Sequence, residues 1–259
     1  MVYKKHRIAL PRIKAHDLNQ DEAYFLLTTA DEGQKKLRFH DYEKIYGIPG
    51  LYEQIFYDRL KCASPATVAR ILNSSIEQAR ERTTELRVLD LGAGNGMMGE
   101  ALLKYGISRM VGVDIIPEAQ EAAERDRPQV YDAYYIMDFC SLTDSDVEEL
   151  QSWSLNCLST VAALGFGDIP PKAFLTALNI IQNEGWVAFN IKETFLDRSD
   201  DSGFSRMIRE LIFSKCIDLY HLERYRHRLS IEGNPLYYFA VTAKKNADVP
   251  LDWLDKYSH

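Results

Sequence analysis

The sequence is poor in the features that mark secreted, metal-binding or membrane proteins. It has four cysteines in 259 residues, and their spacing fits neither a zinc site nor a disulfide framework. Free cysteine behaves as a small apolar side chain, so we expect these residues to be buried, in a reducing cytoplasm: Cys62, Cys140, Cys157 and Cys216. The basic start of the chain has no apolar run of signal-peptide length, and no later segment is long enough to span a membrane. We therefore expect a cytoplasmic protein without membrane association.

The chain also lacks an excess of positive charge, because 38 acidic residues outnumber 31 Lys and Arg. The formal net charge is −7, which argues against a general affinity for nucleic acid because such proteins usually present a basic surface. Hydrophobic residues make up 46% of the chain and charged residues 27%, as in ordinary globular proteins. The length suits one large α/β domain with an additional segment, or two small domains.

Residues 1–83 differ in composition from the rest of the chain. A polar, basic lead is followed by an aromatic-rich stretch at residues 40–60, HDYEKIYGIPGLYEQIFYDRL. After it, apolar residues recur at the spacing of a helix: Val68, Ile71, Leu72, Ile76 and Ala79. We expect helices and loops here, without strands, and interpret residues 1–83 as an N-terminal helical or lid segment.

From residue 86 onward, short apolar runs alternate with helical patterns. Strands are predicted at 87–91, 109–114, 134–139, 154–160 and 186–191, with helices between them. Such alternation predicts a parallel sheet. Extended runs at 217–230 and 236–244, joined by the turn-forming IEGNP, predict a hairpin that adds an antiparallel strand. We place the main domain at 84–246 and a C-terminal tail at 247–259.

The glycine-rich stretch RVLDLGAGNGMMG, residues 87–99, includes the first predicted strand. Gly94, Gly96 and Gly99 match the pattern G-x-G-x-x-G, and Asp114 follows at the spacing of the acid in a dinucleotide-binding fingerprint. A nicotinamide cofactor is therefore compatible with this stretch. A phosphate-binding P-loop is excluded because methionines, rather than Lys and Ser or Thr, follow Gly96.

Acidic residues end three successive predicted strands, at Asp90, Asp114 and Asp138. Carboxylates accept hydrogen bonds from ribose hydroxyls, an α-ammonium group or an adenine amino group. The same carboxylates repel a pyrophosphate. The pattern therefore favours a ligand with few phosphates and many donors over a dinucleotide.

Together, the motifs VLDLGAGNG, MVGVD and IMDF resemble the first three motifs of class I S-adenosylmethionine-dependent methyltransferases, over roughly residues 40–245. The resemblance implies an α/β fold with a Rossmann-like seven-stranded sheet of order 3-2-1-4-5-7-6, its seventh strand antiparallel, and an N-terminal helical cap. The segments AALGFGDIPPKAF and NEGWVAFNIKETF resemble small-molecule-type members, most closely the methyltransferase-like proteins named for the Williams–Beuren chromosomal region. The implied cofactor is S-adenosyl-L-methionine, with S-adenosyl-L-homocysteine as product.

The resemblance also implies roles for individual residues. Asp114 is expected to accept both ribose hydroxyls, Asp138 to accept from the adenine amino group, and Asp90 to brace the glycine loop. The whole implied cofactor-binding set is Asp90, Gly92, Ala93, Gly94, Gly96, Asp114, Ile115, Asp138, Phe139, Ser159 and Tyr46. In it, Ile115 packs on the adenine with Phe139 beside it, and Ser159, with Thr160, contacts the methionine end.

The segment after the fourth predicted strand bears on the methyl acceptor. This stretch, LSTVAALGFGDIPP, lacks the Asn-Pro-Pro-aromatic tetrad of many amino-methylating relatives, which disfavours methylation of adenine N6 or of a glutamine amide. The tyrosine-rich segment resembles the lid of the family, with Tyr46, Tyr52 and Glu53 as the nearest matches. An aromatic face near a sulfonium stabilises it by roughly 0.5–2 kcal/mol. We therefore expect transfer of a methyl group to a small-molecule acceptor by in-line displacement.

The sequence assigns no catalytic residue. A hydroxyl or protonated amine acceptor requires a base, and Glu193, His40 and His227 are candidates, although the sequence favours a solvated or hydrogen-bonded structural role for each. The run ERYRHR places three arginines on one face of a predicted strand, toward solvent or an acidic partner: Arg224, Arg226 and Arg228.

Three alternatives remain open from the sequence. They are a methyltransferase acting on protein or RNA, an NAD(P)-dependent oxidoreductase that uses the glycine-rich loop, and a non-catalytic module that holds the cofactor. The first would use the arginine face to bind its substrate, and the second would bind a nicotinamide in place of an adenosyl compound. The sequence indicates no oligomeric state.

Overall fold

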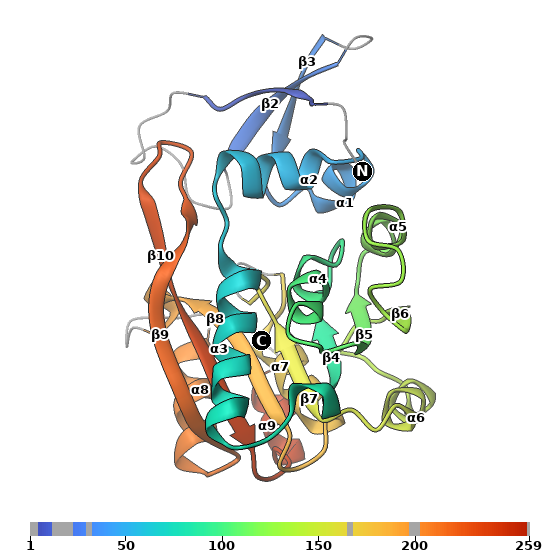
Figure 1. The fold of residues 1–259 in the computed structure, drawn as a ribbon, viewed down its shortest axis with the longest axis vertical. Helices are drawn as coiled ribbons and strands as arrows, with labels where there is room; N and C mark the ends of the chain where they lie inside the picture. The colour runs from blue at the N-terminus through green and yellow to red at the C-terminus, as the bar shows by residue number, and fades with distance from the viewer. Residues whose placement is uncertain (1–4, 12–22, 30–32, 165–167, 197–202, 258–259) are drawn as a thin grey trace.

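The computed structural model describes residues 5–11, 23–29, 33–164, 168–196 and 203–257. These residues form two sheets. A small antiparallel sheet comes from the start of the chain, and a seven-stranded sheet forms the main body (Figure 1).

The main sheet has the strand order β6-β5-β4-β7-β8-β10-β9. Its strands are β4 (Arg87–Leu91), β5 (Arg109–Asp114), β6 (Ala133–Ile136), β7 (Cys157–Thr160), β8 (Trp186–Lys192), β9 (Ile217–Leu229) and β10 (Pro235–Lys245). The strands from β4 to β8 pair in parallel, whereas β10 runs antiparallel to both β8 and β9. Numbered along the chain within this sheet, the order is 3-2-1-4-5-7-6 with an antiparallel seventh strand. The predicted sheet and its terminal hairpin are confirmed.

Helices cover both faces of the main sheet. They are α3 (Ser64–Gln78), α4 (Met97–Leu103), α5 (Pro117–Asp126), α6 (Asp144–Ser152), α7 (Pro171–Ile180) and α8 (Phe204–Phe213), with short 3₁₀ turns at Thr83–Glu85 and Glu193–Leu196. On one face α3 and α4 bury Leu72 and Leu102, and on the other α7 and α8 bury Phe174 and Leu211. Several of these helices have a proline in the first turn, where its fixed φ suits the helix and its missing N–H costs nothing.

The N-terminal segment contains a three-stranded antiparallel sheet, so the expectation of helices and loops without strands is wrong. The strands are β1 (Arg7–Ala9), β2 (Tyr24–Thr29) and β3 (Gly33–Arg38), and they precede α1 (Tyr42–Tyr46), α2 (Leu51–Glu53) and a π-helical segment, Gln54–Arg59. The sequence of β3, GQKKLR, buries only Leu37, so it lacks the apolar alternation that identifies a strand. Residues 1–4, 12–22 and 30–32 of the predicted segment lie outside the described residues.

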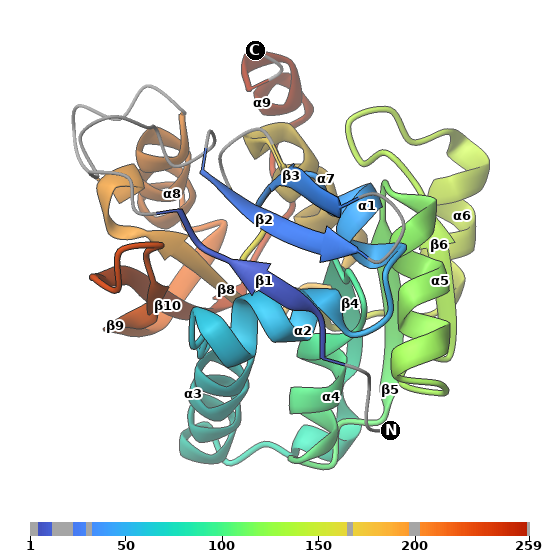
Figure 2. The ribbon, with the colours of Figure 1, turned by 90° about the horizontal axis from the view of Figure 1, so that it is seen from above.

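We call β1 to β3 together with residues 39–60 the cap. An apolar core holds it together, built from Phe25, Leu27, Leu37, Ile45, Leu51 and Ile55. Figures 1 and 2 show the cap above the carboxyl ends of β4 and β5. Ligands of open α/β sheets bind at that end of the strands. The cap and the strand ends therefore face each other across the expected site.

Residues 247–259, expected as a tail, include the helix α9 (Leu251–Lys256). Val249 and Tyr257 flank this helix and are buried in the core that also contains α7. Residues 258–259 lie outside the described residues. The described part of this segment therefore packs onto the main domain.

Of the four cysteines, Cys157 and Cys216 are buried as expected, whereas Cys62 and Cys140 are half-buried. All four carry free thiols. In the part of the chain that the structure describes, no helix has both the length and the apolar character needed to cross a membrane.

Candidate functional site

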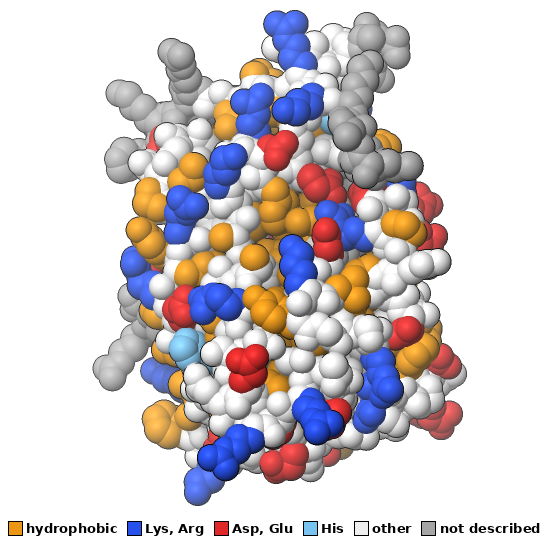
Figure 3. Space-filling model, viewed as in Figure 1, with side chains coloured by type: hydrophobic (Ala, Val, Ile, Leu, Met, Phe, Trp, Pro, Cys, Tyr) orange, Lys and Arg blue, Asp and Glu red, His pale blue; other side chains and the backbone are white. Residues whose placement is uncertain are grey.

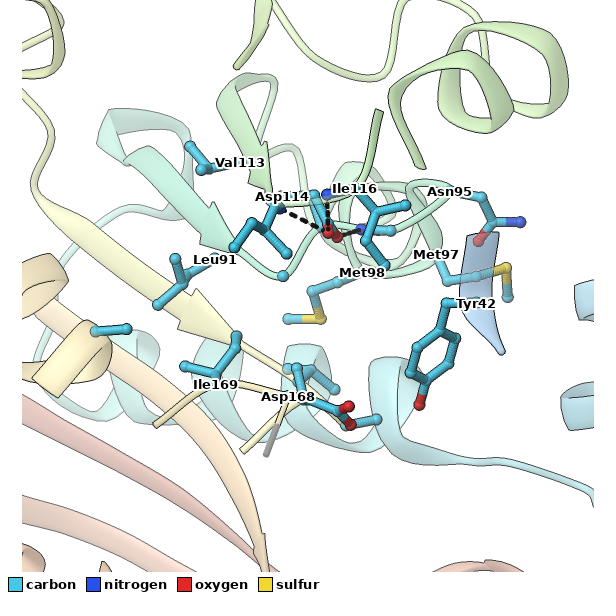
Figure 4. A pocket seen from close by; sticks show the side chains of 18 of the residues that line it. Tyr42, Leu91, Asn95, Met97, Met98, Val113, Asp114, Ile116, Asp168 and Ile169 are labelled. Carbon is cyan, nitrogen blue, oxygen red and sulfur yellow. Dashed lines mark hydrogen bonds between the residues drawn. The ribbon is translucent and has the colours of Figure 1, made fainter. Parts of the chain in front are cut away.

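A cavity of about 470 Å³ lies between the cap and the carboxyl ends of the central strands (Figure 4). The loop after β4 and the segments after β5, β6 and β7 line it from the main domain. Four tyrosines line it from the cap: Tyr42, Tyr46, Tyr52 and Tyr57. Its volume lies within the range of small-molecule sites, about 300–1,000 Å³. The fold thus encloses a ligand-sized space where the sheet topology predicts one.

Glycines let the backbone after β4 approach this cavity closely. Gly92 and Gly94 have φ angles of 73° and 54°, in the left-handed region where other residues are strained. A Cβ on Gly92 would lie 2.8 Å from Cδ1 of Ile169, and one on Gly94 would lie 2.5 Å from the hydroxyl oxygen of Tyr46. Only bare backbone fits between the strand end and the cap. Ala93 also lines the cavity.

Asp114 ends β5 and lines the cavity. One carboxylate oxygen accepts the N–H of Gly94 at 2.9 Å, and the other accepts those of Ile115 at 2.8 Å and Ile116 at 3.1 Å (Figure 4). Burial raises the pKa of this carboxyl, while the three N–H donors act to lower it. Each carboxylate oxygen has more than one acceptor position, so Asp114 can still accept bonds from a ligand diol.

Two apolar residues, Ile115 and Phe139, and the acidic Asp138 line the cavity beside Asp114. Ile115 lines the cavity yet is 59% exposed, which is high for a large apolar side chain. Phe139 is buried, and Asp138 accepts the N–H of Cys140 at 2.8 Å. Because β5 and β6 are adjacent strands, the residues that follow them lie together. Ile115, Asp138 and Phe139 therefore line the same side of the cavity, where the resemblance expects the adenine.

Three of the expected cofactor-binding residues do not line the cavity: Asp90, Gly96 and Ser159. Asp90 is 1% exposed and accepts the hydroxyls of Ser159 and Tyr131, both at 2.6 Å. Burial raises the pKa of Asp90 to about 6. Asp90 and Ser159 are register partners on neighbouring parallel strands, so their side chains point to one face of the sheet and meet there.

Two of these residues had expected roles at the cofactor. Ser159 and Thr160 are fully buried in the sheet and outside the cavity lining, so their expected contact with the methionine end stays a prediction. Asp90 also lies outside the cavity lining, and its expected bracing of the glycine loop stays a prediction. Gly96, which has a φ of 86°, begins α4 behind the loop.

The cap tyrosines form a continuous aromatic surface above the glycine loop. The ring of Tyr46 lies 5.1 Å from that of Tyr52 and 6.0 Å from that of Tyr42, measured between centroids. Burial raises the pKa of all three phenols and of Tyr57, so the four are neutral near physiological pH. They offer aromatic faces and hydroxyl donors, and no negative charge, to a ligand below them.

Arg127 joins the cap to the main domain. Its guanidinium donates to Glu53 of α2 and to Glu100 of α4, both at 2.7 Å. Asn95 of the glycine loop donates to the same Glu53 oxygen at 2.7 Å. The sequence singled out Glu53 but neither of its donors, because the partners lie far apart in the chain and no short motif joins them.

Of the three candidate bases, His40 lines the cavity and the other two do not. Glu193 forms an ion pair with Arg224. His227 is buried, its Nδ1 lies 2.6 Å from Oγ of Ser64, and burial lowers its pKa well below the ordinary value.

His40 has an acidic neighbour that the sequence analysis missed. Its Nδ1 lies 3.4 Å from Oδ1 of Asp168, which also lines the cavity. The two residues are separated by 128 positions, so no spacing in the sequence could reveal the pair.

The predicted arginine face is not a single face. Arg224 lies over the ring of Tyr237 at 3.8 Å, and Arg226 is exposed. Arg228 is only 7% exposed and lies 6.0 Å from the ring of Phe39 in the cap. A register shift in the β9–β10 pairing at this stretch breaks the alternation on which the prediction rested. Figure 3 shows basic and acidic side chains interspersed on the face that it draws.

The cavity lining fits S-adenosylmethionine better than a dinucleotide. The carboxylates of Asp114 and Asp138 suit a ribose diol and an amino group, and Ile115 offers an apolar face to a purine. Among the described residues that line the cavity, there is no Lys or Arg to hold a pyrophosphate. The carboxylate acceptors and the apolar face of the site thus agree with the ligand that the sequence motifs imply.

Comparisons with known proteins agree with the fold. Residues 89–189 match the family model of a methyltransferase domain. A search of curated proteins finds no significant match. Among solved structures, an S-adenosylmethionine-dependent methyltransferase of Anabaena variabilis ATCC 29413 is 13% identical with a TM-score of 0.50, covering 79% of this chain and 93% of that chain.

Two further structures show the range of such neighbours. A proposed RNA methyltransferase of Pyrococcus horikoshii is 14% identical with a TM-score of 0.50, over 70% of this chain and 83% of that chain. The magnesium protoporphyrin IX methyltransferase of Synechocystis PCC 6803 is 12% identical with a TM-score of 0.49, over 70% and 79%. The matched residues 89–189 contain most of the glycine loop together with Asp114 and Asp138. Residues 89–189 thus match a methyltransferase domain, and the seven-stranded sheet around them agrees with the fold of these methyltransferase structures.

Proposed function

We propose that this protein transfers the methyl group of S-adenosylmethionine to a small-molecule acceptor. The cofactor supplies a methyl group activated by a sulfonium, so the protein has mainly to bind, orient and exclude water. The observation that carries the proposal is the aromatic roof, because the cap tyrosines line the same cavity as the glycine loop. A roofed cavity suits a molecule that fits inside it.

Within this proposal the lining residues divide the cofactor among them. Asp114 accepts the ribose hydroxyls and Asp138 the adenine amino group, with Ile115 packed on the purine. The backbone of Gly92 to Gly94 lies along the methionine part. Tyr46, which lies over Gly94, presents its ring near the sulfonium.

The charge distribution disfavours RNA as the acceptor. A nucleic-acid substrate requires cationic contacts to its phosphates, and the described lining of the cavity contains neither Lys nor Arg. Arg228, one of the three arginines expected to form a basic face, is buried. These observations favour a neutral or cationic small molecule, and the expected cytoplasmic location stays a prediction.

Calorimetric titration with S-adenosylhomocysteine tests the cofactor assignment. Asp114→Ala removes two charge-assisted bonds to the ribose, each worth about 1.5–3 kcal/mol, so affinity should fall by on the order of 10²–10⁴. Asp132→Ala is the matched control, since Asp132 also accepts a backbone N–H, that of Met110 at 2.9 Å, but lies outside the cavity. Unchanged affinity in Asp114→Ala would refute the ribose assignment.

A second experiment tests the acceptor class. The protein is incubated with methyl-labelled S-adenosylmethionine and, separately, with a metabolite extract, total RNA and total protein. We expect label in the low-molecular-weight products. Label confined to RNA or protein would contradict the small-molecule acceptor while leaving the cofactor assignment intact.

A further inference from the structure

His40 and Asp168 meet at the part of the cavity that faces Asp114. Their Nδ1 and Oδ1 atoms are 3.4 Å apart, and both side chains are mostly shielded from solvent. His40 comes from the cap immediately before α1, and Asp168 from the segment between β7 and α7. Figure 4 shows Asp168 near Tyr42 and across the cavity from Asp114. Cap and main domain therefore each contribute one member of a histidine–carboxylate pair.

Among the described residues that line the cavity, His40 is the best suited to take up a proton. The four cap tyrosines are neutral, and burial also raises the pKa of the half-buried Cys140. Asp114 and Asp138 already accept backbone N–H groups in the region proposed for the cofactor. His40 differs from these groups, because histidine is the side-chain type that ordinarily changes protonation near neutral pH.

The tautomer of His40 follows from its partner. A carboxylate oxygen only accepts hydrogen bonds, so the Nδ1 that faces Asp168 carries the proton. The lone pair of the neutral ring is then on Nε2. The distance of 3.4 Å is long for a hydrogen bond, as is common for catalytic pairs before substrate binds.

The charges of the lining restrict the form in which an acceptor enters. Three carboxylates line the cavity, those of Asp114, Asp138 and Asp168, without a Lys or Arg among the described lining residues. An acceptor that is already an anion would be repelled. The acceptor therefore enters neutral or as a cation, and a neutral hydroxyl then loses its proton within the site, where the aromatic surface above it suits a planar ring.

We propose that His40 is the general base of the methyl transfer, that Asp168 positions it, and that the acceptor is a neutral phenolic hydroxyl on a planar ring. The inference rests on the proposed methyltransferase function. The acceptor oxygen forms its bond to the methyl carbon as the carbon–sulfur bond breaks, and that bond's electron pair goes to sulfur. The hydroxyl proton goes to Nε2 of His40, and the resulting imidazolium lies beside the carboxylate of Asp168 before it returns the proton to water.

Two phenols that differ in acidity provide the test. 4-Methylphenol ionises near the tyrosine value of about 10 and needs a base at neutral pH, whereas 4-nitrophenol is already substantially ionised there. With saturating S-adenosylmethionine, we expect His40→Gln and His40→Ala to lower kcat for 4-methylphenol by about 10²–10⁴, with little change in KM. The lining carboxylates repel the 4-nitrophenol anion, so its KM should be higher in every form of the protein, but its loss of kcat at saturation should be much smaller. Added imidazole should restore part of the rate of His40→Ala with 4-methylphenol.

The positioning role of Asp168 is tested by a measurement that a merely structural role would leave unchanged, the tautomer of His40. In ¹⁵N spectra of the imidazole rings, Asp168→Asn should reduce the Nδ1–H tautomer of His40, and Asp168→Glu should restore both this signal and part of kcat. The partly exposed pair His221 and Glu223, 3.5 Å apart on β9 and outside the cavity lining, provides matched controls. His221→Ala and Glu223→Gln should leave both phenol reactions unchanged.

The outcomes separate the inference from the function on which it rests. Affinity for S-adenosylhomocysteine confirms that each variant is folded. Equal losses for both phenols, or no loss in His40→Ala, would overturn the role of His40. A wild-type protein that binds S-adenosylhomocysteine but methylates neither phenol would overturn the acceptor class. Failure of the wild type to bind S-adenosylhomocysteine would count against the proposed function instead.

Discussion

The contact between Gly94 and Tyr46 offers a sharp test of how the cap meets the glycine loop. In Gly94→Ala, the new Cβ would lie 2.5 Å from the Tyr46 hydroxyl oxygen, at a backbone φ of 54°. Tyr46 cannot easily move aside, because it is only 6% exposed and Arg125 donates to its backbone oxygen at 3.0 Å. The substitution therefore strains the backbone and overpacks the contact.

The two costs can be separated. An L-residue in the left-handed region costs about 1–2 kcal/mol, and overpacking adds about 1–3 kcal/mol, so the unfolding free energy should fall by about 2–5 kcal/mol. Gly233→Ala is the matched control, since Gly233 has a φ of 90° with nothing within 4 Å of the added Cβ. It should lose only the backbone part. Adding Tyr46→Phe to Gly94→Ala removes the clashing oxygen and should recover most of the difference.

Urea unfolding of the three variants and of Tyr46→Phe alone completes the double-mutant cycle. Titration with S-adenosylhomocysteine on the same samples should show weaker binding in Gly94→Ala, because the loop that lines the cavity is displaced. If Gly94→Ala loses no more stability than Gly233→Ala, the cap does not rest on the loop in solution, and the roofed cavity is refuted.

Three further predictions concern the groups around the site. Burial raises the pKa of Asp90 from 3.8 to about 6, so the folded protein holds this proton more tightly than the unfolded chain; stability should fall by up to about 3 kcal/mol as the pH rises from about 4 to 6. Asp90→Asn should lack that part of the decline in urea unfolding, and identical pH profiles would contradict the assignment. Arg127→Ala removes a charge-assisted bond to Glu53 worth about 1.5–3 kcal/mol, so amide hydrogen exchange in α2 should accelerate; unchanged exchange would show that the bond does not hold the cap. Asn190→Ala leaves the N–H of Ala162 without its 2.6 Å acceptor and should cost about 1–3 kcal/mol in unfolding free energy; no measurable change would argue against this anchor of the cavity wall.

The main sheet was predictable because each strand carries its own signal. In a parallel sheet covered on both faces, β4, β5 and β8 are almost wholly buried, and their apolar runs stand out between amphipathic helices. The loop with Gly92 and Gly94 was equally visible, because close approach of the backbone needs glycine itself. At these positions, the local preference of each residue agrees with its place in the fold.

The cap and the contacts across the cavity were not predictable in this way. β3 is mostly polar and exposed, so its pairing with β2 left no periodic pattern. The contacts of Arg127 with Glu53 and of His40 with Asp168 join residues from different layers, and only the folded chain brings them together. The bulge that buries Arg228 also depends on register rather than on local sequence. The likeness to the Williams–Beuren-region proteins and the small-molecule acceptor stay predictions.

Native mass spectrometry with two competing ligands tests the central claim most directly. The purified protein is mixed with equal amounts of S-adenosylhomocysteine and NADH, and its intact complexes are weighed. The carboxylate-lined cavity predicts one bound S-adenosylhomocysteine per chain and no NADH. A spectrum with NADH bound and S-adenosylhomocysteine absent would contradict it.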